Sequence, residues 1–251
     1  MALPANDAPQ HNRSAPQGQC ATKGSVVNRF SSLEAVVFDF DGTLAELVID
    51  FEIMKNMVAR VAGTYLPEVP PANGLPVLEY VSRLAGNIRA AVSPGAAEAY
   101  VAAAAQGIRD QEVASARTAR LFPGTRHALR LLAGHGLKVG IITRNCRAAV
   151  LTVFPDATEY AGVLVARDDA RHVKPDPRHL LDALRVLGAD PARSLMVGDH
   201  PMDLATGKAA GARTAGVASG RIGLDELARH QPDYLAPDVT ALVPMLEAAA
   251  E

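Results

Sequence analysis

Short apolar runs alternate with helical patterns along most of the 251-residue chain. Five runs are rich in Val and Ile and lack strict polar alternation, which is typical of strands buried on both faces. They are EAVVFDF (34–40), LKVGIIT (137–143), GVLVA (162–166), SLMVGD (194–199) and RTAGVA (213–218). Amphipathic stretches lie between the later runs, and several end on Gly, a usual helix stop. The pattern predicts an α/β fold built on a doubly wound parallel sheet.

The alternation is interrupted after the first predicted strand. Residues 46–119 contain no convincing strand and hold three helical stretches. The Ala-rich stretch has Ser93 where an N-cap belongs and Pro94 at the first helical position. We therefore expect an all-helical domain of residues 46–119, inserted into a core domain of residues 31–45 and 120–251 that a C-terminal helix closes.

Residues 1–30 differ from the rest of the chain. They are rich in Pro, Gln, Asn, Ser and Ala and show no hydrophobic periodicity, which indicates a disordered extension. They lack the apolar centre of a secretory signal. Their shortage of acidic residues leaves one alternative, a transit peptide that would direct the protein to an organelle such as the chloroplast.

Composition and charge exclude several classes of function. A formal net charge of -2 and a pI of about 6.4 provide no basic field for nucleic acid and no polybasic patch for lipid. No apolar run approaches the ~18 residues that a membrane helix needs. The two cysteines, one of them in the polar extension, favour a reducing compartment, so we expect a cytoplasmic protein. No feature of the sequence indicates an oligomeric state.

Two carboxylates, Asp39 and Asp41, follow the first apolar run and are themselves followed by Gly42 and Thr43. Because strand side chains alternate, we expect both carboxylates to point the same way at the carboxyl end of a central strand, where open α/β sheets bind ligands. A buried carboxylate pair needs a cation or a shared proton. Gly42 permits a sharp turn and a close approach of backbone to a ligand, and we expect Gly42 and Thr43 to contact that ligand. The alternative is a strand end capped by acidic turn residues.

Two further strand ends supply groups that could bind phosphate. Thr143 ends the second predicted strand, and its hydroxyl and the N–H groups of Arg144 and Asn145 could hold phosphate oxygens at a helix start. Lys174 lies between two such strands in the proline-rich sequence HVKPDP and could act as a cationic clamp. Taken alone, Thr143 could simply cap a helix and Lys174 could be a solvated side chain.

Another pair of carboxylates follows the fourth predicted strand. Asp199 could bind a hard cation through oxygen, and Asp203 could support the same cation through water or orient Asp199. Asp203 alone could be an ordinary acid in the first turn of a helix. These groups follow one another along the chain: the first acid pair, the threonine hydroxyl, the lysine and the second acid pair. Their order predicts a phosphoryl site with a carboxylate nucleophile, Mg²⁺, a cationic clamp and a proton donor.

The motifs DFDGTL, IITRN, VKPDP and GDHPMD resemble the four motifs of the haloacid dehalogenase-like superfamily. The helical insertion resembles the type I cap of phosphoglycolate phosphatase-like members, and the resemblance covers residues from about 34 to 220. It implies that Asp39 is a nucleophile that becomes an aspartyl-phosphate and that Asp41 is the general acid and then the base. It also implies that Thr143 and Lys174 bind the phosphoryl group.

The same resemblance implies how Mg²⁺ is held. Its ligands would be the Asp39 carboxylate, the Asp41 backbone carbonyl and Asp199, with Asp203 in support. We therefore expect an Mg²⁺-dependent phosphatase that acts on a small phosphorylated metabolite. Dehalogenases and phosphonatases lack the second acid, so Asp41 argues against both. A sugar phosphomutase, and a non-catalytic binding protein of the same fold, are the alternatives.

The identity of the substrate cannot be predicted from the sequence. In a capped enzyme of this type, the cap face toward the site sets specificity. Candidate anion contacts on that face are Arg60, Arg83, Arg89 and Arg109, and the alternative is that each is a solvated surface charge. Cys146 lies close to the predicted site, either as an oxidation-sensitive thiol or as a small buried residue.

Overall fold

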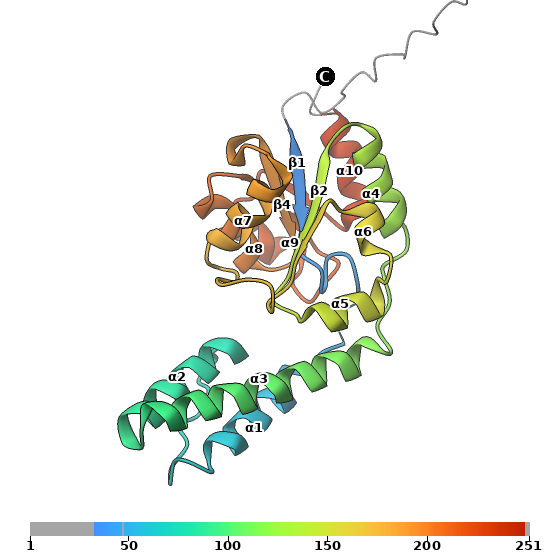
Figure 1. Ribbon diagram of the computed structural model, residues 1–251. Coiled ribbons are helices and arrows are strands. Elements are labelled where there is room, and N and C mark those ends of the chain that lie inside the picture. Colours follow the sequence, from blue (N-terminus) through green and yellow to red (C-terminus); the bar gives the residue numbers. More distant parts are fainter. Residues whose placement is uncertain (1–32, 47, 249–251) are drawn as a thin grey trace, which may run out of the picture.

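A computed structural model of the chain describes residues 33–46 and 48–248, so the predicted extension over residues 1–30 lies outside the described residues. Within them, a six-stranded, wholly parallel sheet has the order β3-β2-β1-β4-β5-β6 (Figure 1). The strands are β1 (Ala35–Phe38), β2 (Lys138–Ile142), β3 (Val163–Val165), β4 (Ser194–Gly198), β5 (Arg213–Val217) and β6 (Tyr234–Ala236). The predicted doubly wound parallel sheet is confirmed, and β6 is an addition that the apolar pattern does not indicate.

Helices cover both faces of this sheet (Figure 1). One face carries α4 (Thr125–Gly134), α6 (Ala157–Tyr160) and α10 (Val239–Ala248). The opposite face carries α7 (Arg178–Leu187) and α8 (Pro201–Ala209). The two remaining helices of this part are α5 (Arg147–Val153), which follows β2, and α9 (Leu224–Arg229), which contacts β5 and β6.

The central strand β1 shows why the predicted strands lack polar alternation. Val36 and Phe38 pack in the cluster that contains α4 and α10, whereas Ala35 and Val37 pack in the cluster that contains Leu180 of α7. All four β1 side chains are fully buried. Because helices cover both faces, every position of the strand is apolar.

Three helices lie between β1 and α4, as the sequence predicts for this insertion. They are α1 (Phe51–Ala62), α2 (Val77–Ala91) and α3 (Pro94–Ala116). They bury their own apolar cluster around Leu84, Ile88 and Tyr100, separate from the clusters on the sheet. The predicted N-cap is confirmed, because the Ser93 hydroxyl accepts a hydrogen bond of 3.1 Å from the N–H of Ala96. The domain limits 46 and 119 stay a prediction.

The inserted helices contact the sheet domain through charged side chains and through a small apolar cluster between α3 and α5. Three ion pairs join the two parts: Glu79–Arg144, Arg109–Asp168 and Glu112–Arg167. Each pairs a residue of α2 or α3 with a loop that follows β2 or β3. The inserted helices therefore lie over the carboxyl edge of the sheet, below α5 in Figure 1.

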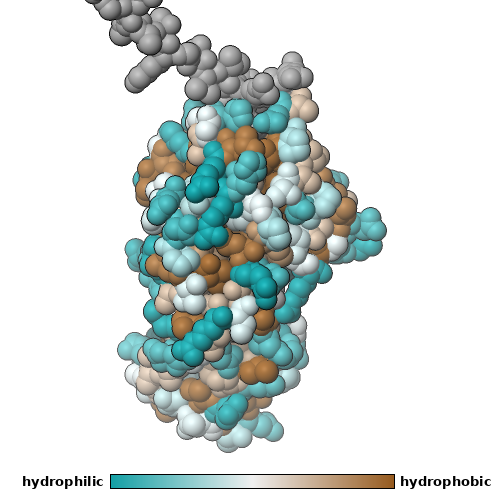
Figure 2. Space-filling view, turned by 90° about the vertical axis from the view of Figure 1, so that its right-hand side faces the viewer, coloured by the Kyte–Doolittle hydropathy of each residue, from teal (hydrophilic) through white to brown (hydrophobic). Residues whose placement is uncertain are grey.

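The outer surface mixes apolar and hydrophilic residues. On the face shown in Figure 2, apolar residues form separate patches between hydrophilic ones. None of the helices in residues 33–46 and 48–248 combines the length and the apolar character that a membrane span requires.

Candidate active site

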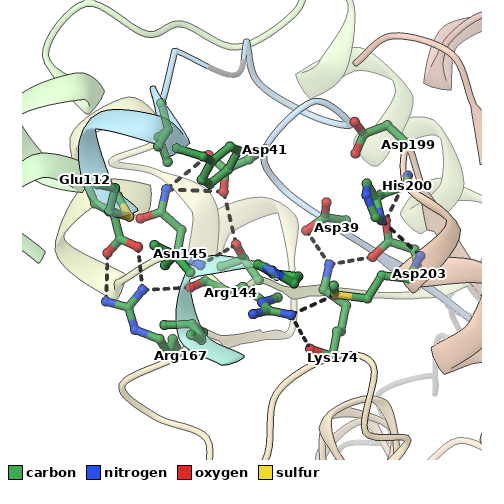
Figure 3. A pocket seen from close by; sticks show the side chains of 18 of the residues that line it. Asp39, Asp41, Glu112, Arg144, Asn145, Arg167, Lys174, Asp199, His200 and Asp203 are labelled. Atoms are coloured by element: carbon green, nitrogen blue, oxygen red, sulfur yellow. Dashed lines mark hydrogen bonds and ion pairs between the residues drawn. The ribbon is translucent and has the colours of Figure 1, made fainter. Parts of the chain in front are cut away.

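The two carboxylates of the first motif lie in the turn beyond β1. The strand ends at Phe38, and the N–H of Asp39 still donates to the carbonyl of Val197 at 2.8 Å. Asp41 lies in a turn that Gly42 closes with a φ of 85°. The strand alternation used in the prediction therefore stops before Asp39. Both carboxylates nevertheless line one cavity of about 300 Å³ at the carboxyl edge of the sheet (Figure 3).

Gly42 and Thr43 position a different carboxylate of the site. A Cβ atom on Gly42 would lie 2.3 Å from Oδ2 of Asp199, so only glycine allows this approach. The Thr43 hydroxyl donates to Oδ1 of Asp199 at 3.2 Å. The structure thus places both residues against Asp199 and not among the residues that line the cavity. Their contact with a substrate stays a prediction.

Lys174 connects two carboxylates inside the site. Its Nζ lies 2.5 Å from Oδ1 of Asp39 and 2.6 Å from Oδ1 of Asp203, and the residue is 3% exposed. Burial alone would lower the pKa of this ammonium group, but the charges of Asp203 and Asp39 outweigh it and raise the pKa. Lys174 is therefore a fixed cation at neutral pH.

Asp39, Asp199 and Asp203 form a compact group of buried acids. One carboxylate oxygen from each lies within 4.8 Å of the others. Burial, reinforced by the charges of Asp39 and Asp203, raises the pKa of Asp199 to about 8. Burial also raises the pKa of Asp39 to about 6, against the opposing charge of Lys174. Oxygen ligands at this spacing could hold a hard divalent cation, which would relieve the repulsion among them.

Asp41 has other neighbours. Its carboxylate accepts hydrogen bonds from Nδ2 of Asn145 at 3.0 and 3.2 Å and from the Thr143 hydroxyl at 3.1 Å. Burial, and then the charge of Asp39, raises the pKa of Asp41 to about 7. The Thr143 hydroxyl also accepts from the N–H of Asn145 at 3.0 Å. Thr143 and Asn145, predicted to contact phosphate, therefore also orient Asp41.

Arg144 connects the site to the inserted helices. Its guanidinium lines the cavity and donates to the Lys174 carbonyl at 3.0 Å and to Oε2 of Glu79 at 2.7 Å. Burial would raise the pKa of Glu79, but the hydrogen bond and charge of Arg144 hold it below its usual value. The predicted motif residue thus contacts α2 directly.

The cavity also contains residues that are absent from the sequence prediction, among them the ion pair of Glu112 and Arg167. Glu112 of α3 is 4% exposed and pairs through both oxygens with Arg167, with Nη2 to Oε2 at 2.8 Å (Figure 3). The Glu112 carboxylate also accepts from the N–H of Cys146 at 3.2 Å. Arg167 is the second residue after the end of β3. This position at a strand end is a signal that sequence reasoning could have used. Glu112 has no such local signal.

Cys146 is fully buried, and burial raises the pKa of its thiol to about 11. The group is therefore protonated at neutral pH, which disfavours the reactive thiolate. Its surroundings match the small buried residue of the sequence analysis, and not the oxidation-sensitive thiol.

The four arginines proposed as anion contacts do not line the cavity. Arg109 pairs with Asp168 at 2.8 Å, and Arg60 and Arg89 are exposed. Arg83 lies over the ring of Tyr80 and donates to the carbonyl of Pro71. Helical periodicity shows which face of a helix is apolar, but not which part of it meets a cavity. The positions of these arginines match the alternative of surface charges.

Comparison with known proteins agrees with the fold. A family model described as haloacid dehalogenase-like hydrolase matches residues 33–211. Pyrophosphatase PpaX of Bacillus cereus strain AH820 is 28% identical over 216 residues, which cover 85% of this chain and 96% of that protein. Pyrophosphatase PpaX of Bacillus pumilus strain SAFR-032 is 36% identical over 122 residues, which cover 48% of this chain and 56% of that protein.

A solved structure shows the same fold. A hydrolase from Pseudomonas syringae superimposes with a TM-score of 0.60 at 23% identity, covering 87% of this chain and all of that one. The family model spans most of the described residues, from the start of β1 to beyond α8. This chain belongs to the haloacid dehalogenase-like hydrolase family.

Proposed function

We propose that the protein is an Mg²⁺-dependent phosphatase that hydrolyses a small phosphate monoester through a phosphorylated Asp39. The observation that carries the proposal is the difference between two carboxylates that line one cavity. Asp39 lies 2.5 Å from the cationic Nζ of Lys174, whereas Asp41 has neutral donors and a pKa of about 7. A carboxylate held by a cation suits a nucleophile, and a pKa near neutrality suits proton transfer in both directions.

The proposed metal ligands are the carboxylates of Asp39, Asp199 and Asp203, with the backbone carbonyl of Asp41. Three buried carboxylate oxygens within 4.8 Å of one another match the hard oxygen ligands that Mg²⁺ prefers. When bound, Mg²⁺ would neutralise charge on the phosphate oxygens and on the acids. Lys174, already paired with two of these acids, would contribute the second positive charge.

The chain's own residues can perform both halves of the reaction. Lys174 and the groups around Thr143 would hold the phosphoryl oxygens while an oxygen of Asp39 attacks phosphorus. The bond from phosphorus to the leaving oxygen breaks, and Asp41 donates its proton to that oxygen. Asp41 then accepts a proton from a water molecule that attacks the phosphorus, which releases phosphate and restores the Asp39 carboxylate.

We also propose that residues 46–119 act as a cap domain. Side chains of α1 and α2, among them Met54 and Val77, line the cavity that the carboxylates share. A cover of this kind excludes water from the reaction and positions the leaving group. The sheet domain would then supply the chemistry and the inserted helices the selectivity.

A phosphate-release assay tests the proposed activity. The panel should contain small phosphate monoesters, 4-nitrophenyl phosphate and, because two relatives are named pyrophosphatase, inorganic pyrophosphate. We expect turnover with Mg²⁺, none in EDTA, and none for Asp39→Asn, while the exposed control Asp225→Asn keeps its activity. Conversion of a hexose 1-phosphate to the 6-phosphate would instead support the phosphomutase, and a uniformly inactive panel would support a binding protein.

A further inference from the structure

The part of the cavity that the inserted segment lines is mainly apolar. Apart from Gly74, Lys55 and Glu112, its residues are Ile49, Phe51, Met54, Leu75, Pro76, Val77 and Leu78. Met202 of α8 adds a further apolar side chain from the sheet domain. A charged or strongly hydrated group placed against this surface would lose water without gaining hydrogen bonds, which is unfavourable.

The cations that line this cavity already have carboxylate partners. Among the described lining residues, the cations besides Lys174 form the pairs Lys55–Glu52, Arg144–Glu79 and Arg167–Glu112. Arg144 and Arg167 also donate to backbone carbonyls, at 3.0 and 2.8 Å. An anionic leaving group could use only the N–H groups that these bonds leave, on a guanidinium whose charge a carboxylate already balances.

Lys55 has the weakest of these pairs. Its Nζ lies 2.8 Å from Oε1 of Glu52, whose side chain is 76% exposed, and exposed pairs of this kind contribute little free energy. Lys55 is therefore the cation that an anionic leaving group could recruit most easily. The test below includes this residue for that reason.

The buried acids of the cavity add a further electrostatic effect. Glu112 is 4% exposed and lines the same cavity as Asp41, on the side of the inserted helices. Its charge and that of Arg167 neutralise each other, so this side offers no net positive charge to a second anion.

We propose that this cavity selects phosphate esters whose leaving group is uncharged and mainly apolar, such as a short alkyl or aryl alcohol. Leaving groups that carry a carboxylate or a second phosphate are disfavoured. The proposal names the substrate class of the phosphatase site and rests on that proposed function. A cavity of about 300 Å³, shared with the phosphoryl group, also restricts the leaving group to small alcohols.

The first test compares esters that differ in the charge of the leaving group. We would measure kcat/KM of the full chain with Mg²⁺ for benzyl phosphate, 2-phosphoglycolate and inorganic pyrophosphate. We expect kcat/KM for benzyl phosphate to exceed that for either anionic substrate by about tenfold or more. Apolar pockets discriminate between substrates by factors of this size. A preference for either anionic substrate overturns the proposal but leaves the phosphatase activity intact. If no ester, 4-nitrophenyl phosphate included, releases phosphate, the phosphatase proposal fails and this one with it.

A binding measurement provides a readout that does not depend on turnover. Benzylphosphonate and phosphonoacetate contain no phosphate-ester bond, so a phosphatase does not hydrolyse them. Both can be titrated calorimetrically into the Mg²⁺-loaded protein. We expect tighter binding of benzylphosphonate. Equal or tighter binding of phosphonoacetate contradicts the inference even where turnover is too slow to compare.

A variant that frees a cation tests the electrostatic part of the argument. Glu79→Gln keeps the shape of the side chain but removes the charge that neutralises Arg144. We expect the ratio of kcat/KM for 2-phosphoglycolate over benzyl phosphate to rise severalfold. The exposed α3 variant Glu98→Gln, with the same change of net charge, should leave the ratio unchanged. The proposal would be overturned if wild type and Glu79→Gln gave equal ratios. It would also be overturned if wild type preferred 2-phosphoglycolate and Lys55→Gln abolished that preference.

Discussion

Asp39 and Asp41 are two positions apart, yet their neighbours differ in charge. The carboxylate of Asp39 lies against the Lys174 ammonium at 2.5 Å, while that of Asp41 accepts hydrogen bonds from the neutral Thr143 and Asn145 side chains. Burial raises the pKa of both carboxyl groups, to about 6 for Asp39 and about 7 for Asp41. Of the two, Asp41 is the better proton donor at neutral pH.

Substitution of each aspartate should separate the two proposed roles. Asp39→Asn removes the attacking anion, so turnover should fall to background for every substrate. Asp41→Asn removes a proton donor and acceptor worth typically ~10²–10⁴-fold, and should affect alkyl phosphates most because an alkoxide leaves poorly without a proton. With 4-nitrophenyl phosphate, Asp41→Asn should give a burst of about one nitrophenolate per site and then a slow steady rate.

Rapid mixing and mass spectrometry of the quenched protein measure this difference. The burst should coincide with a phosphate adduct on the peptide that contains Asp39. If Asp41→Asn loses equal activity toward both ester types and never accumulates a phosphoenzyme, its acid–base role is wrong. Metal-dependent turnover by Asp39→Asn would contradict the covalent mechanism.

His179 provides a second prediction at the scale of one residue. Its fully buried ring accepts from the N–H of Lys174 at 3.2 Å, and burial, followed by the Lys174 charge, lowers its pKa to about 4. Because the folded pKa lies below the unfolded value of about 6.5, the neutral ring stabilises the fold above pH 6.5. This contribution is lost as the pH falls through 4, and it amounts to roughly 3 kcal/mol at most.

Urea denaturation of wild type and His179→Gln at several pH values measures this contribution. The difference in free energy of unfolding should be largest near pH 7 and should shrink as the pH approaches 4. His127→Gln, which removes an exposed ring, is the matched control. A difference for His179→Gln that does not change with pH would show that its ring titrates alike in both states.

Residues of the site differ in how far the sequence could predict them. Asp39, Thr143 and Asp199 end or follow apolar runs in ordered motifs, and the parallel sheet brings the ends of such runs to one edge. Glu112 and Arg167 are 55 positions apart and meet only because α3 folds back over the loop after β3. No local pattern predicts that contact, so tertiary structure alone reveals the pair.

Among the elements, the continuity of the apolar run decides which strands the sequence predicts. The strands β1, β2, β4 and β5 have four or five residues of nearly continuous apolar character and are covered on both faces. The strand β3 has only three residues, but they are Val and Leu and lie in a predicted run. The three residues of β6 include Tyr and follow a polar segment, and the four residues of α6 are too few for a helical period to show. The helices α1 to α3 follow from their periodicity, but the side that faces the site depends on contacts with distant loops.

Replacement of two helix glycines by alanine should have opposite effects on stability. A Cβ atom on Gly86, in the middle of α2, would meet no atom within 4 Å, so Gly86→Ala should stabilise the protein by up to about 1 kcal/mol. A Cβ on Gly207 of α8 would lie 2.6 Å from the Thr214 methyl and 2.9 Å from Cβ of Met196 on β4. Such overpacking costs typically 1–3 kcal/mol and exceeds the gain in helix propensity of about 1 kcal/mol.

Chemical denaturation of both variants tests the packing of α8 on the sheet. The midpoint should rise for Gly86→Ala and fall for Gly207→Ala, with similar denaturant dependence. Equal stabilisation by the two substitutions would mean that α8 lies farther from β4 and β5 than the structure places it.

At the scale of the whole molecule, the carboxyl edge of the sheet concentrates negative charge that the fold itself does not neutralise. Burial, and then the charges of Asp39 and Asp203, raise the pKa of Asp199 to about 8. Burial raises the pKa of Asp39 to about 6 against the opposing charge of Lys174. Because each folded pKa exceeds the unfolded value of 3.8, the stability contribution of each group is full below about pH 4. It is lost as the pH rises through 6 for Asp39 and through 8 for Asp199.

Stabilisation by Mg²⁺ should therefore increase with pH. Metal binding requires the ionised carboxylates, so between pH 6 and pH 8 the apparent affinity should rise by up to about tenfold per pH unit as Asp199 ionises. Differential scanning calorimetry with Mg²⁺ and with EDTA at each pH gives the shift in melting temperature that the metal causes. Because both scans are made at the same pH, the titration of groups remote from the site cancels in this shift. We expect a larger shift at pH 8 than at pH 6 for wild type, and a small shift that is nearly independent of pH for Asp199→Asn. Equal shifts at both pH values in wild type would mean that Mg²⁺ binds away from the Asp39, Asp199 and Asp203 cluster, and the metal assignment would be wrong.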